Sequence, residues 1–417
     1  MPFQNGMIVF ANACLYFYNS PVSKGPTLII MNIFDTKSKV IVTCSNRLSP
    51  FLQQEIEELG YRPERVFKTG VELMGDLKDC IKLNIHLRCA SQVLFSLKKF
   101  VAYNADDLYK ELKKISWEHI IPQDSYFSIS SNVTNETITN NLFANVKVKD
   151  AIADRFREVK GSRPDSGPEL NAVVVHLYWK EQLAEIFIDT SGETLSKHGY
   201  RKIPGKAPML ESLAASTLRA VQWDRQSVFI NPMCGSGTVA IEAAMLATNR
   251  KPGLYRNNYS FMHLCGYDEL MYQQLFSAME SQVISGSKVK IIASDLSEDA
   301  VNISAVNAGI AGVEELIIFE QCDFASTTVP DNGNGVVFFN PEYGDRLGEE
   351  MALQETYKRM GDFLKQRCKG YMGYIFTGNL ELAKKIGLKP KRRMEYFNGK
   401  IDCRLLEYEL YAGSRNA

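Results

Sequence analysis

Two short segments carry residue types that could hold a methyl donor beside a planar amine. Residues 231–238 read Asn-Pro-Met-Cys-Gly-Ser-Gly-Thr, and residues 340–344 read Asn-Pro-Glu-Tyr-Gly. Glycines let a backbone approach a ligand closely, and a helix opening at Thr238 would offer free N–H groups and the positive end of a dipole. The first segment therefore suits a carboxylate, such as the one on S-adenosylmethionine.

Two carboxylates downstream strengthen a nucleoside interpretation. Asp295 follows an apolar strand-like run, where it could accept hydrogen bonds from ribose hydroxyls, and Asp323 follows the next run, where it could accept from an adenine amino group. The simpler alternative is that both residues only cap the helices after them. Their order with the glycine segment favours the nucleoside site. The candidate donor-binding residues are Asn231, Pro232, Cys234, Gly235, Ser236, Gly237, Thr238, Asp295 and Asp323.

A glycine pair alone is weak evidence, because plain turns and dinucleotide loops also contain one. The segment lacks the third glycine of a dinucleotide loop and the Lys-Ser/Thr pair of a phosphate loop. NAD and ATP are therefore disfavoured.

The second segment suits an exocyclic amine on a nucleic-acid base. Such an amine is a poor nucleophile, and the Asn340 side-chain oxygen and the Pro341 carbonyl could accept its two N–H bonds, so that orientation supplies much of the rate. Tyr343 could stack on the base, the alternative being a core aromatic. Glu342 completes the candidate catalytic segment. A nucleic-acid base would have to leave its stack to reach these residues.

The pattern of elements would place these segments at one sheet edge. From residue 211 onward, apolar runs and helical patterns alternate, which predicts an α/β domain with a mostly parallel, doubly wound sheet. Upstream, two smaller α+β modules are expected, with turn residues 165–168 as a loop. We expect an N-terminal extension at 1–38, modules at 39–90 and 91–190, a connection at 191–208 and the α/β domain at 209–417.

Composition limits the class of protein. The 417-residue chain has formal net charge zero, 45% hydrophobic and 23% charged residues, and nine cysteines without a metal-like cluster. These values favour a cytoplasmic protein with reduced thiols, no metal and no membrane contact, since no apolar run reaches the roughly 18 to 20 residues of a membrane span. The apolar residues 7–18 lack the basic region of a signal peptide. Translation from Met31 instead of Met1 is a hypothesis.

Local basic clusters could bind phosphates despite the neutral total. The most C-terminal of these clusters, Lys391 to Arg393, stands beside Tyr396 and Phe397, which could stack on bases. The alternative for each cluster is a solvated face. The candidate RNA-binding residues are Lys147, Lys149, Lys197, Arg201, Lys202, Lys391, Arg392 and Arg393. The five histidines show no ligand spacing and are expected to be packing or surface residues.

Several longer motifs resemble one family. They include Lys147-Val-Lys-Asp-Ala-Ile152, His198-Gly-Tyr-Arg201, residues 231–256 and Asn398-Gly-Lys-Ile-Asp-Cys403. The chain is similar to the THUMP-domain class I methyltransferases, and within them to the bacterial enzymes that methylate guanine N2 in 23S ribosomal RNA. The resemblance implies a ferredoxin-like module, a THUMP RNA-binding domain and a Rossmann-like methyltransferase domain. It also implies S-adenosylmethionine as cofactor and 23S ribosomal RNA as partner, in a single-stranded or loop region where a base can leave its stack.

Two residues depart from the family pattern. Asn231 stands where the family usually has Asp, and this change keeps a hydrogen-bond acceptor but loses a negative charge. Glu342 stands where the family usually has Pro. Proline would stiffen the turn. Glu342 could point outward, add an acceptor near the amine or mark a decayed site. Methylation of adenine N6 or of a glutamine side chain, and a non-catalytic ribosome-assembly role, remain alternatives.

Overall fold

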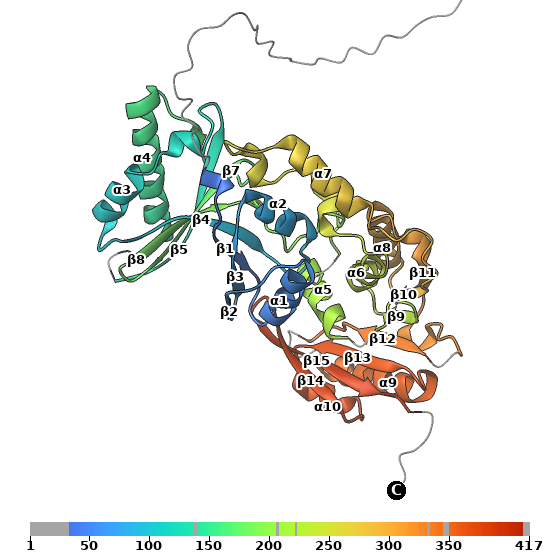
Figure 1. Ribbon diagram of the computed structural model, residues 1–417. Coiled ribbons are helices and arrows are strands. Elements are labelled where there is room, and N and C mark those ends of the chain that lie inside the picture. The colour runs from blue at the N-terminus through green and yellow to red at the C-terminus, as the bar shows by residue number, and fades with distance from the viewer. Residues whose placement is uncertain are drawn as a thin grey trace, which may run out of the picture.

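Two β-sheets organise the molecule. The computed structural model describes residues 33–136, 138, 140–205, 208–221, 223–331, 334–344 and 350–411, so the alternative start at Met31 lies outside the described residues. Figure 1 shows the blue-to-green N-terminal half and the yellow-to-red C-terminal half side by side, each built around its own sheet. No helix in the described ranges is long and apolar enough to cross a membrane.

The first module contributes three strands to an eight-stranded sheet, and the strand that follows joins it to the second module. The strand order is β2-β3-β1-β4-β8-β7-β5-β6, and β4 pairs antiparallel with both β1 and β8. The sheet is therefore continuous from the first module into the second. Helix α2 begins at a capping box in which Asp76 and Asp79 each accept from the other's backbone N–H. The elements are η1 (Ile33–Asp35), β1 (Ser38–Thr43), α1 (Ser49–Glu58), β2 (Arg65–Phe67), β3 (Gly70–Gly75), α2 (Leu77–His86) and β4 (Gln92–Val101).

The second module completes this sheet and covers it with α3 and α4. Helix α4 begins after Asn140, whose side chain accepts from Leu142 N–H, and ends at Gly161 with φ 78°. The predicted loop at 165–168 is wrong for its first two residues, because Asp165–Ser166 pair parallel with the free edge of β5. The elements are α3 (Ala105–Lys113), η2 (Trp117–His119), β5 (Tyr126–Thr134), α4 (Asn141–Lys160), β6 (Asp165–Ser166), β7 (Val173–Lys180) and β8 (Leu183–Asp189).

The C-terminal half holds the predicted doubly wound sheet. Its order is β11-β10-β9-β12-β13-β15-β14, parallel from β11 to β13, with β15 antiparallel to both neighbours. The first elements are α5 (Glu211–Ala220), β9 (Val228–Pro232), α6 (Thr238–Ala247), η3 (Pro252–Tyr255), η4 (Ser260–His263), α7 (Glu269–Glu280), β10 (Ile291–Asp295) and α8 (Glu298–Ile310). The last are η5 (Glu314–Leu316), β11 (Ile317–Gln321), η6 (Phe324–Ser326), β12 (Gly335–Phe339), α9 (Glu350–Arg367), β13 (Met372–Thr377), α10 (Leu380–Lys385), β14 (Arg392–Asn398) and β15 (Ile401–Glu409).

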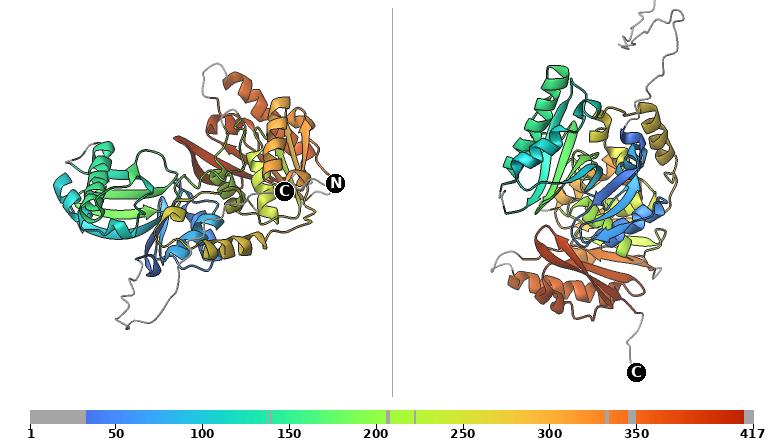
Figure 2. Two further views of the ribbon diagram at one scale, coloured as in Figure 1. Left: turned by 90° about the horizontal axis from the view of Figure 1, so that it is seen from above. Right: turned by 60° about the vertical axis from the view of Figure 1, so that its left-hand side comes forward.

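The strand order reverses at β9, which has β10 on one side and β12 on the other. Every residue of β9 and β12 is buried, as expected of central parallel strands covered on both faces. Ligands of open α/β sheets bind outside the carboxyl ends of the strands at such a reversal. The two halves also share packing, since α1 contacts α5 and α2 contacts α7, an arrangement that Figures 1 and 2 show from three sides.

Candidate functional site

The glycine segment forms a tight turn between β9 and α6. Met233, Gly235 and Gly237 all have positive φ, at 56°, 56° and 79°. A Cβ on Gly237 would meet Ser304 Oγ at 2.8 Å, so glycine is needed there for close packing against α8. Around Gly235, a Cβ would meet nothing within 4 Å. The turn is thus packed on one side and open on the other, as a ligand cradle requires.

Asn231 offers an unused acceptor beside this turn. Its side chain is buried and its Nδ2 donates to Phe338 O over 2.8 Å, while its Oδ1 is buried without a hydrogen-bond partner among the described residues. Leaving such an atom unpaired costs on the order of 1–3 kcal/mol. An incoming N–H donor, such as the ammonium group of an amino acid, would relieve this cost. Asn231 therefore fits the amino-acid part of S-adenosylmethionine.

Asp295 holds the glycine turn rather than capping a helix. Its Oδ2 accepts from Gly235 N–H over 2.9 Å and its Oδ1 from Ser297 N–H over 3.0 Å. Helix α8 is capped by Ser297, whose Oγ accepts from Ala300 N–H. The simpler alternative for Asp295 is therefore wrong. Both carboxylate oxygens retain a lone pair for a ligand hydroxyl.

The residue after Asp295 was missed by the sequence reasoning. Leu296 is 72% exposed, although the apolar cores lie close by. A large apolar side chain left in water next to the candidate ribose carboxylate could cover one face of a base. The available signal was an apolar residue directly after a strand-end acid.

Asp323 is engaged in a different way. Its Oδ1 accepts from Ala325 N–H at the start of η6 and pairs with Arg359 Nη2 of α9 over 2.6 Å. The Arg359 guanidinium lowers the pKa of the Asp323 carboxyl. This geometry matches the simpler capping alternative. A contact from Asp323 to adenine stays a prediction, and it would have to use the other carboxylate oxygen.

The Asn-Pro turn leaves β12 at the same edge of the sheet. Ile230 of β9 is in register with both Val337 of β12 and Ile292 of β10, so residues that follow these strands come out together. Asn340 Oδ1 accepts from Tyr343 O–H over 3.0 Å. Asn231, Asp295 and Asn340 are thereby brought to one edge.

Side chains from α9, β13 and the start of α10 hold the turn in place. Tyr357 O–H donates to Glu342 O over 3.1 Å, and Asn379 Nδ2 donates to Tyr343 O over 3.2 Å. The Glu342 side chain is exposed. This exposure is consistent with an outward orientation of Glu342, and a role near the amine stays a prediction.

Tyr343 packs as a core aromatic in this structure, and its stacking on a base stays a prediction. Its ring packs against Phe376 with centroids 6.3 Å apart, and burial raises the pKa of its hydroxyl. That hydroxyl occupies the Asn340 oxygen assigned to the amine. Stacking of Tyr343 on a base therefore requires the hydroxyl to release Asn340.

Arg201, predicted to bind RNA, is nearly buried and ion-paired in this structure, which disfavours that role. Its side chain is 10% exposed, and its guanidinium pairs with Glu211 Oε2 over 2.9 Å and donates to Met209 O and Thr238 Oγ1. The charge is neutralised by a neighbour that the sequence pattern could not pair with it.

The basic cluster on β14 is also largely committed. Lys391 pairs with Glu409, and Arg392 pairs with the buried Glu407. Arg393 stays exposed. The two carboxylates come from β15, which lies beside β14 in the sheet.

The predicted stacking role is wrong for Tyr396, and for the partly exposed Phe397 it stays a prediction. Tyr396 is fully buried, stacked at 5.9 Å on Phe51 and edge-on to Phe376, and Phe397 lies under the Arg47 guanidinium. These side chains join the halves of the molecule. The remaining candidates, Lys147, Lys149, Lys197 and Lys202, are partly or fully exposed.

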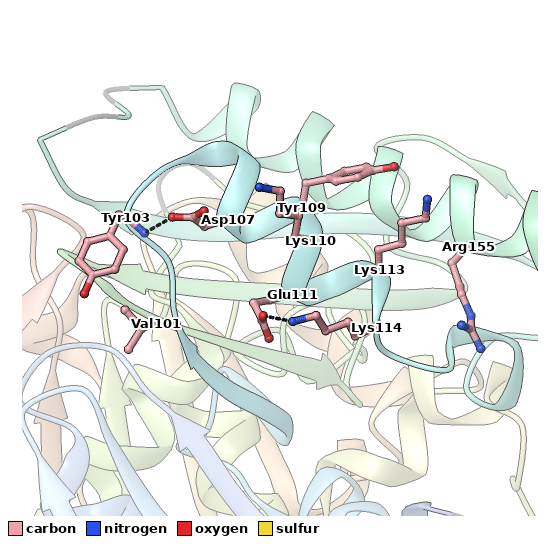
Figure 3. Close-up of a pocket in the computed structure, with 9 residues that line it drawn as sticks. All are labelled: Val101, Tyr103, Asp107, Tyr109, Lys110, Glu111, Lys113, Lys114 and Arg155. Atoms are coloured by element: carbon pink, nitrogen blue, oxygen red, sulfur yellow. Dashed lines mark hydrogen bonds and ion pairs between the residues drawn. The ribbon is translucent and has the colours of Figure 1, made fainter.

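A groove of about 950 Å³ lies on the second module, remote in sequence from the Asn-Pro turn (Figure 3). It lies beside the end of β4 and α3, and none of the predicted RNA-binding residues lines it. Tyr103 is 61% exposed there. Its lining residues are Val101, Tyr103, Asp107, Tyr109, Lys110, Glu111, Lys113, Lys114 and Arg155.

The described residues hold no cluster of three or more metal-ligating side chains.

Family comparisons follow the same three-part order. Residues 198–407 match the family described as RMKL-like methyltransferase domain, residues 39–94 match the RlmL ferredoxin-like domain and residues 102–189 match the THUMP domain. The predicted resemblance and fold class are therefore confirmed.

A curated relative supports the same assignment. The Marinomonas sp. (strain MWYL1) protein named ribosomal RNA large subunit methyltransferase K/L is 32% identical over 395 residues, covering 92% of this chain and 55% of that protein. The chain thus spans about half the length of this relative.

Three solved structures share the whole fold, each with a TM-score of 0.81. SMU.472, a putative methyltransferase complexed with SAH, is 25% identical and covers 91% of this chain and 99% of its own. A possible methylase from Clostridium difficile 630 is 28% identical, with 91% and 100% covered. A predicted N6-adenine-specific DNA methylase from Listeria monocytogenes str. 4b F2365 is 28% identical, with 90% and 97% covered.

Proposed function

Because the chain belongs to the family of RMKL-like methyltransferase domains, we propose that it transfers a methyl group from S-adenosylmethionine to the exocyclic N2 amine of a guanine in 23S ribosomal RNA. The observation that carries the proposal is the gathering of an unpaired acceptor on Asn231, the Asp295 carboxylate and the Asn340 amide at one edge of the sheet. Methyl transfer needs the groups that bind the donor, Asn231 and Asp295, next to the group that binds the amine, Asn340.

The donor side is assigned to the glycine turn and the strand ends around it. Asn231 Oδ1 would accept from the ammonium group, and the N–H groups at the start of α6 would face the carboxylate. Asp295 would accept from the ribose hydroxyls and Leu296 would cover the adenine. The similar SMU.472 protein is complexed with SAH, which supports S-adenosylmethionine as the donor. The bound donor supplies an electrophilic methyl group on its sulfonium centre.

The acceptor side is assigned to the Asn-Pro turn. Asn340 Oδ1 and the Pro341 carbonyl would accept the two N–H bonds of the amine, which orients its lone pair along the line of transfer. Tyr343 would release Asn340 and stack on the base. A strong general base is unnecessary, because the methylated ammonium is acidic and loses its proton readily. The exposed Glu342 side chain has no step to perform.

The RNA is assigned to the N-terminal half. The THUMP match and the relative's ribosomal RNA name favour an RNA substrate over a protein. In the groove of Figure 3, exposed Tyr103 offers a stacking surface and Lys110, farther along the groove, offers a cation. Lys197 and Lys202 lie in the connection between the halves.

The test is methyl transfer from a labelled donor onto undermodified ribosomal RNA, followed by nucleoside mass spectrometry. We expect labelled N2-methylguanosine in the large-subunit RNA. Labelled N6-methyladenosine would replace the proposal with its main alternative, which the name of the Listeria relative keeps in view.

Transfer and binding separate the remaining alternatives. Absence of transfer together with tight SAH binding would indicate a missing partner or another substrate. Absence of both would favour a non-catalytic assembly role. An Asn340→Gln variant tests whether the position of the amide matters for methyl transfer, because it keeps the amide and displaces it by one methylene.

A further inference from the structure

The connection between the two halves is packed against the candidate donor site rather than free. Ser191, His198 and Tyr200 are completely buried in it. Residues 198–205 run beside the glycine turn and the first residues of α6. We call this stretch the strap.

One contact of the strap reaches the end of the glycine turn. Arg201 Nη1 donates to Thr238 Oγ1 over 3.1 Å and to Met209 O over 2.7 Å, while Nη2 pairs with Glu211 Oε2. Thr238 Oγ1 lies 3.3 Å from Ser236 Oγ within the turn. A nearly buried guanidinium thus links α5 to the point where the turn becomes a helix.

A second contact runs along the other side of the turn. Asn307 of α8 donates through Nδ2 to Ile203 O over 3.0 Å and to Ser236 O over 3.4 Å, and its Oδ1 accepts from Ile203 N–H over 3.3 Å. A Cβ on Gly205 would stand 3.0 Å from Ser236 Cβ. One amide therefore holds the strap and the turn together.

The far part of α6 is held by the N-terminal half. His198 Nδ1 lies 2.6 Å from Glu242 Oε1, and its Nε2 lies 2.9 Å from Arg88 O. Arg88 donates through Nη2 to Met245 O over 3.3 Å and to Arg250 O, near the C-terminus of α6. Helix α6, behind the candidate donor site, is therefore held near both ends by contacts with the strap and the first module.

We propose that Arg201 is a positioning residue for the methyl donor, because it fixes the turn at residues 233–237 through Thr238 without touching the donor. Met233 is a non-glycine residue with a φ of 56°, so the turn depends on its surroundings to stay in this conformation. Asn307 supports the same turn from the opposite side. This inference rests on the proposed donor site and adds the N-terminal half as part of its frame.

The test is calorimetric titration of SAH into the full chain and its variants. Arg201→Ala should weaken SAH binding by about 10- to 100-fold, the range typical of losing an outer partner that orients the groups in contact with a ligand. Arg201→Lys keeps the charge but loses the planar fork, so it should recover only part of the affinity. With active enzyme, the KM for S-adenosylmethionine should rise while the KM for RNA stays within about twofold.

A matched control separates positioning from general destabilisation. Lys39→Ala removes another ion pair with a buried partner, Glu185, between β1 and β8 and away from the turn. It should lower thermal stability and leave the Kd for SAH unchanged. If Arg201→Ala does not fold, Asn307→Ala tests the same turn and should weaken SAH binding by about 3- to 10-fold.

The outcomes distinguish this inference from the function on which it rests. Unchanged SAH affinity in both Arg201→Ala and Asn307→Ala, with a wild-type chain that binds SAH, would overturn the positioning role alone. An equal loss in Lys39→Ala would also overturn it. A wild-type chain that fails to bind SAH would remove the proposed donor site itself.

Discussion

Replacing Asp295 by Asn should weaken donor binding much more than a loss of one charge on the surface would. The two backbone N–H groups that reach Asp295 bond to different oxygens, Gly235 N–H to Oδ2 and Ser297 N–H to Oδ1. An Asn side chain has one oxygen, so its NH2 group must face one of these donors. One backbone N–H then loses its acceptor.

The expected magnitude follows from these contacts. Leaving one backbone N–H unsatisfied should lower the free energy of unfolding by about 1–3 kcal/mol, less where water can reach the group. Losing one charge-assisted bond to the ribose should cost a further ~1.5–3 kcal/mol of binding. That energy corresponds to roughly a 10- to 150-fold rise in the Kd for SAH.

Denaturant unfolding and calorimetric titration measure the two effects separately, and Asp224→Asn is the matched control. Asp224 also accepts two backbone N–H groups, from Gln226 and Ser227, but both bond to its Oδ1 at the amino end of β9. An Asn there can keep both bonds. We therefore expect a small loss of stability and an unchanged Kd for SAH.

A donor analogue without ribose hydroxyls tests directly whether Asp295 binds the ribose. The wild-type chain should bind 2′,3′-dideoxy-SAH more weakly than SAH by the factor above, and Asp295→Asn should discriminate less between them. Equal binding of the two ligands by the wild-type chain would refute the assignment of Asp295 to the ribose.

Three further perturbations test the acceptor turn and the neighbouring carboxylate. Asn340→Ala should reduce kcat by about 100-fold or more while the Kd for SAH stays within about twofold, since the amide orients only the amine. Single-turnover kinetics would measure the loss of rate. Unchanged turnover would remove the turn from the mechanism. Glu342→Ala should change kcat by less than about twofold because its side chain is exposed; a tenfold loss would show that the carboxylate takes part. The Arg359 guanidinium lowers the pKa of Asp323 below 3.8, so this pair stabilises the fold above that pH and ceases to do so as pH falls through the folded pKa. The stability gap between the wild-type chain and Asp323→Asn should therefore narrow on acidification from pH 7 to pH 3 in urea unfolding, and a gap independent of pH would contradict the ion pair.

The sequence alone determined the local frame of the candidate site. The predicted helix start at Thr238 is where α6 begins, and the predicted parallel strands have Asn231, Asp295 and Asn340 at or just after their ends. These features depend on local periodicity and on the rule that parallel strands end at a common edge, so neighbouring residues suffice to predict them.

Only the tertiary structure decided which polar and aromatic groups are available. Arg201 and Arg392 resemble surface cations in the sequence, yet Glu211 and Glu407 neutralise them, and Tyr396 is enclosed by aromatic rings from distant elements. The physical reason is that burial and ion pairing depend on which distant residues the packed elements bring together, whereas a single-sequence pattern records only neighbours along the chain.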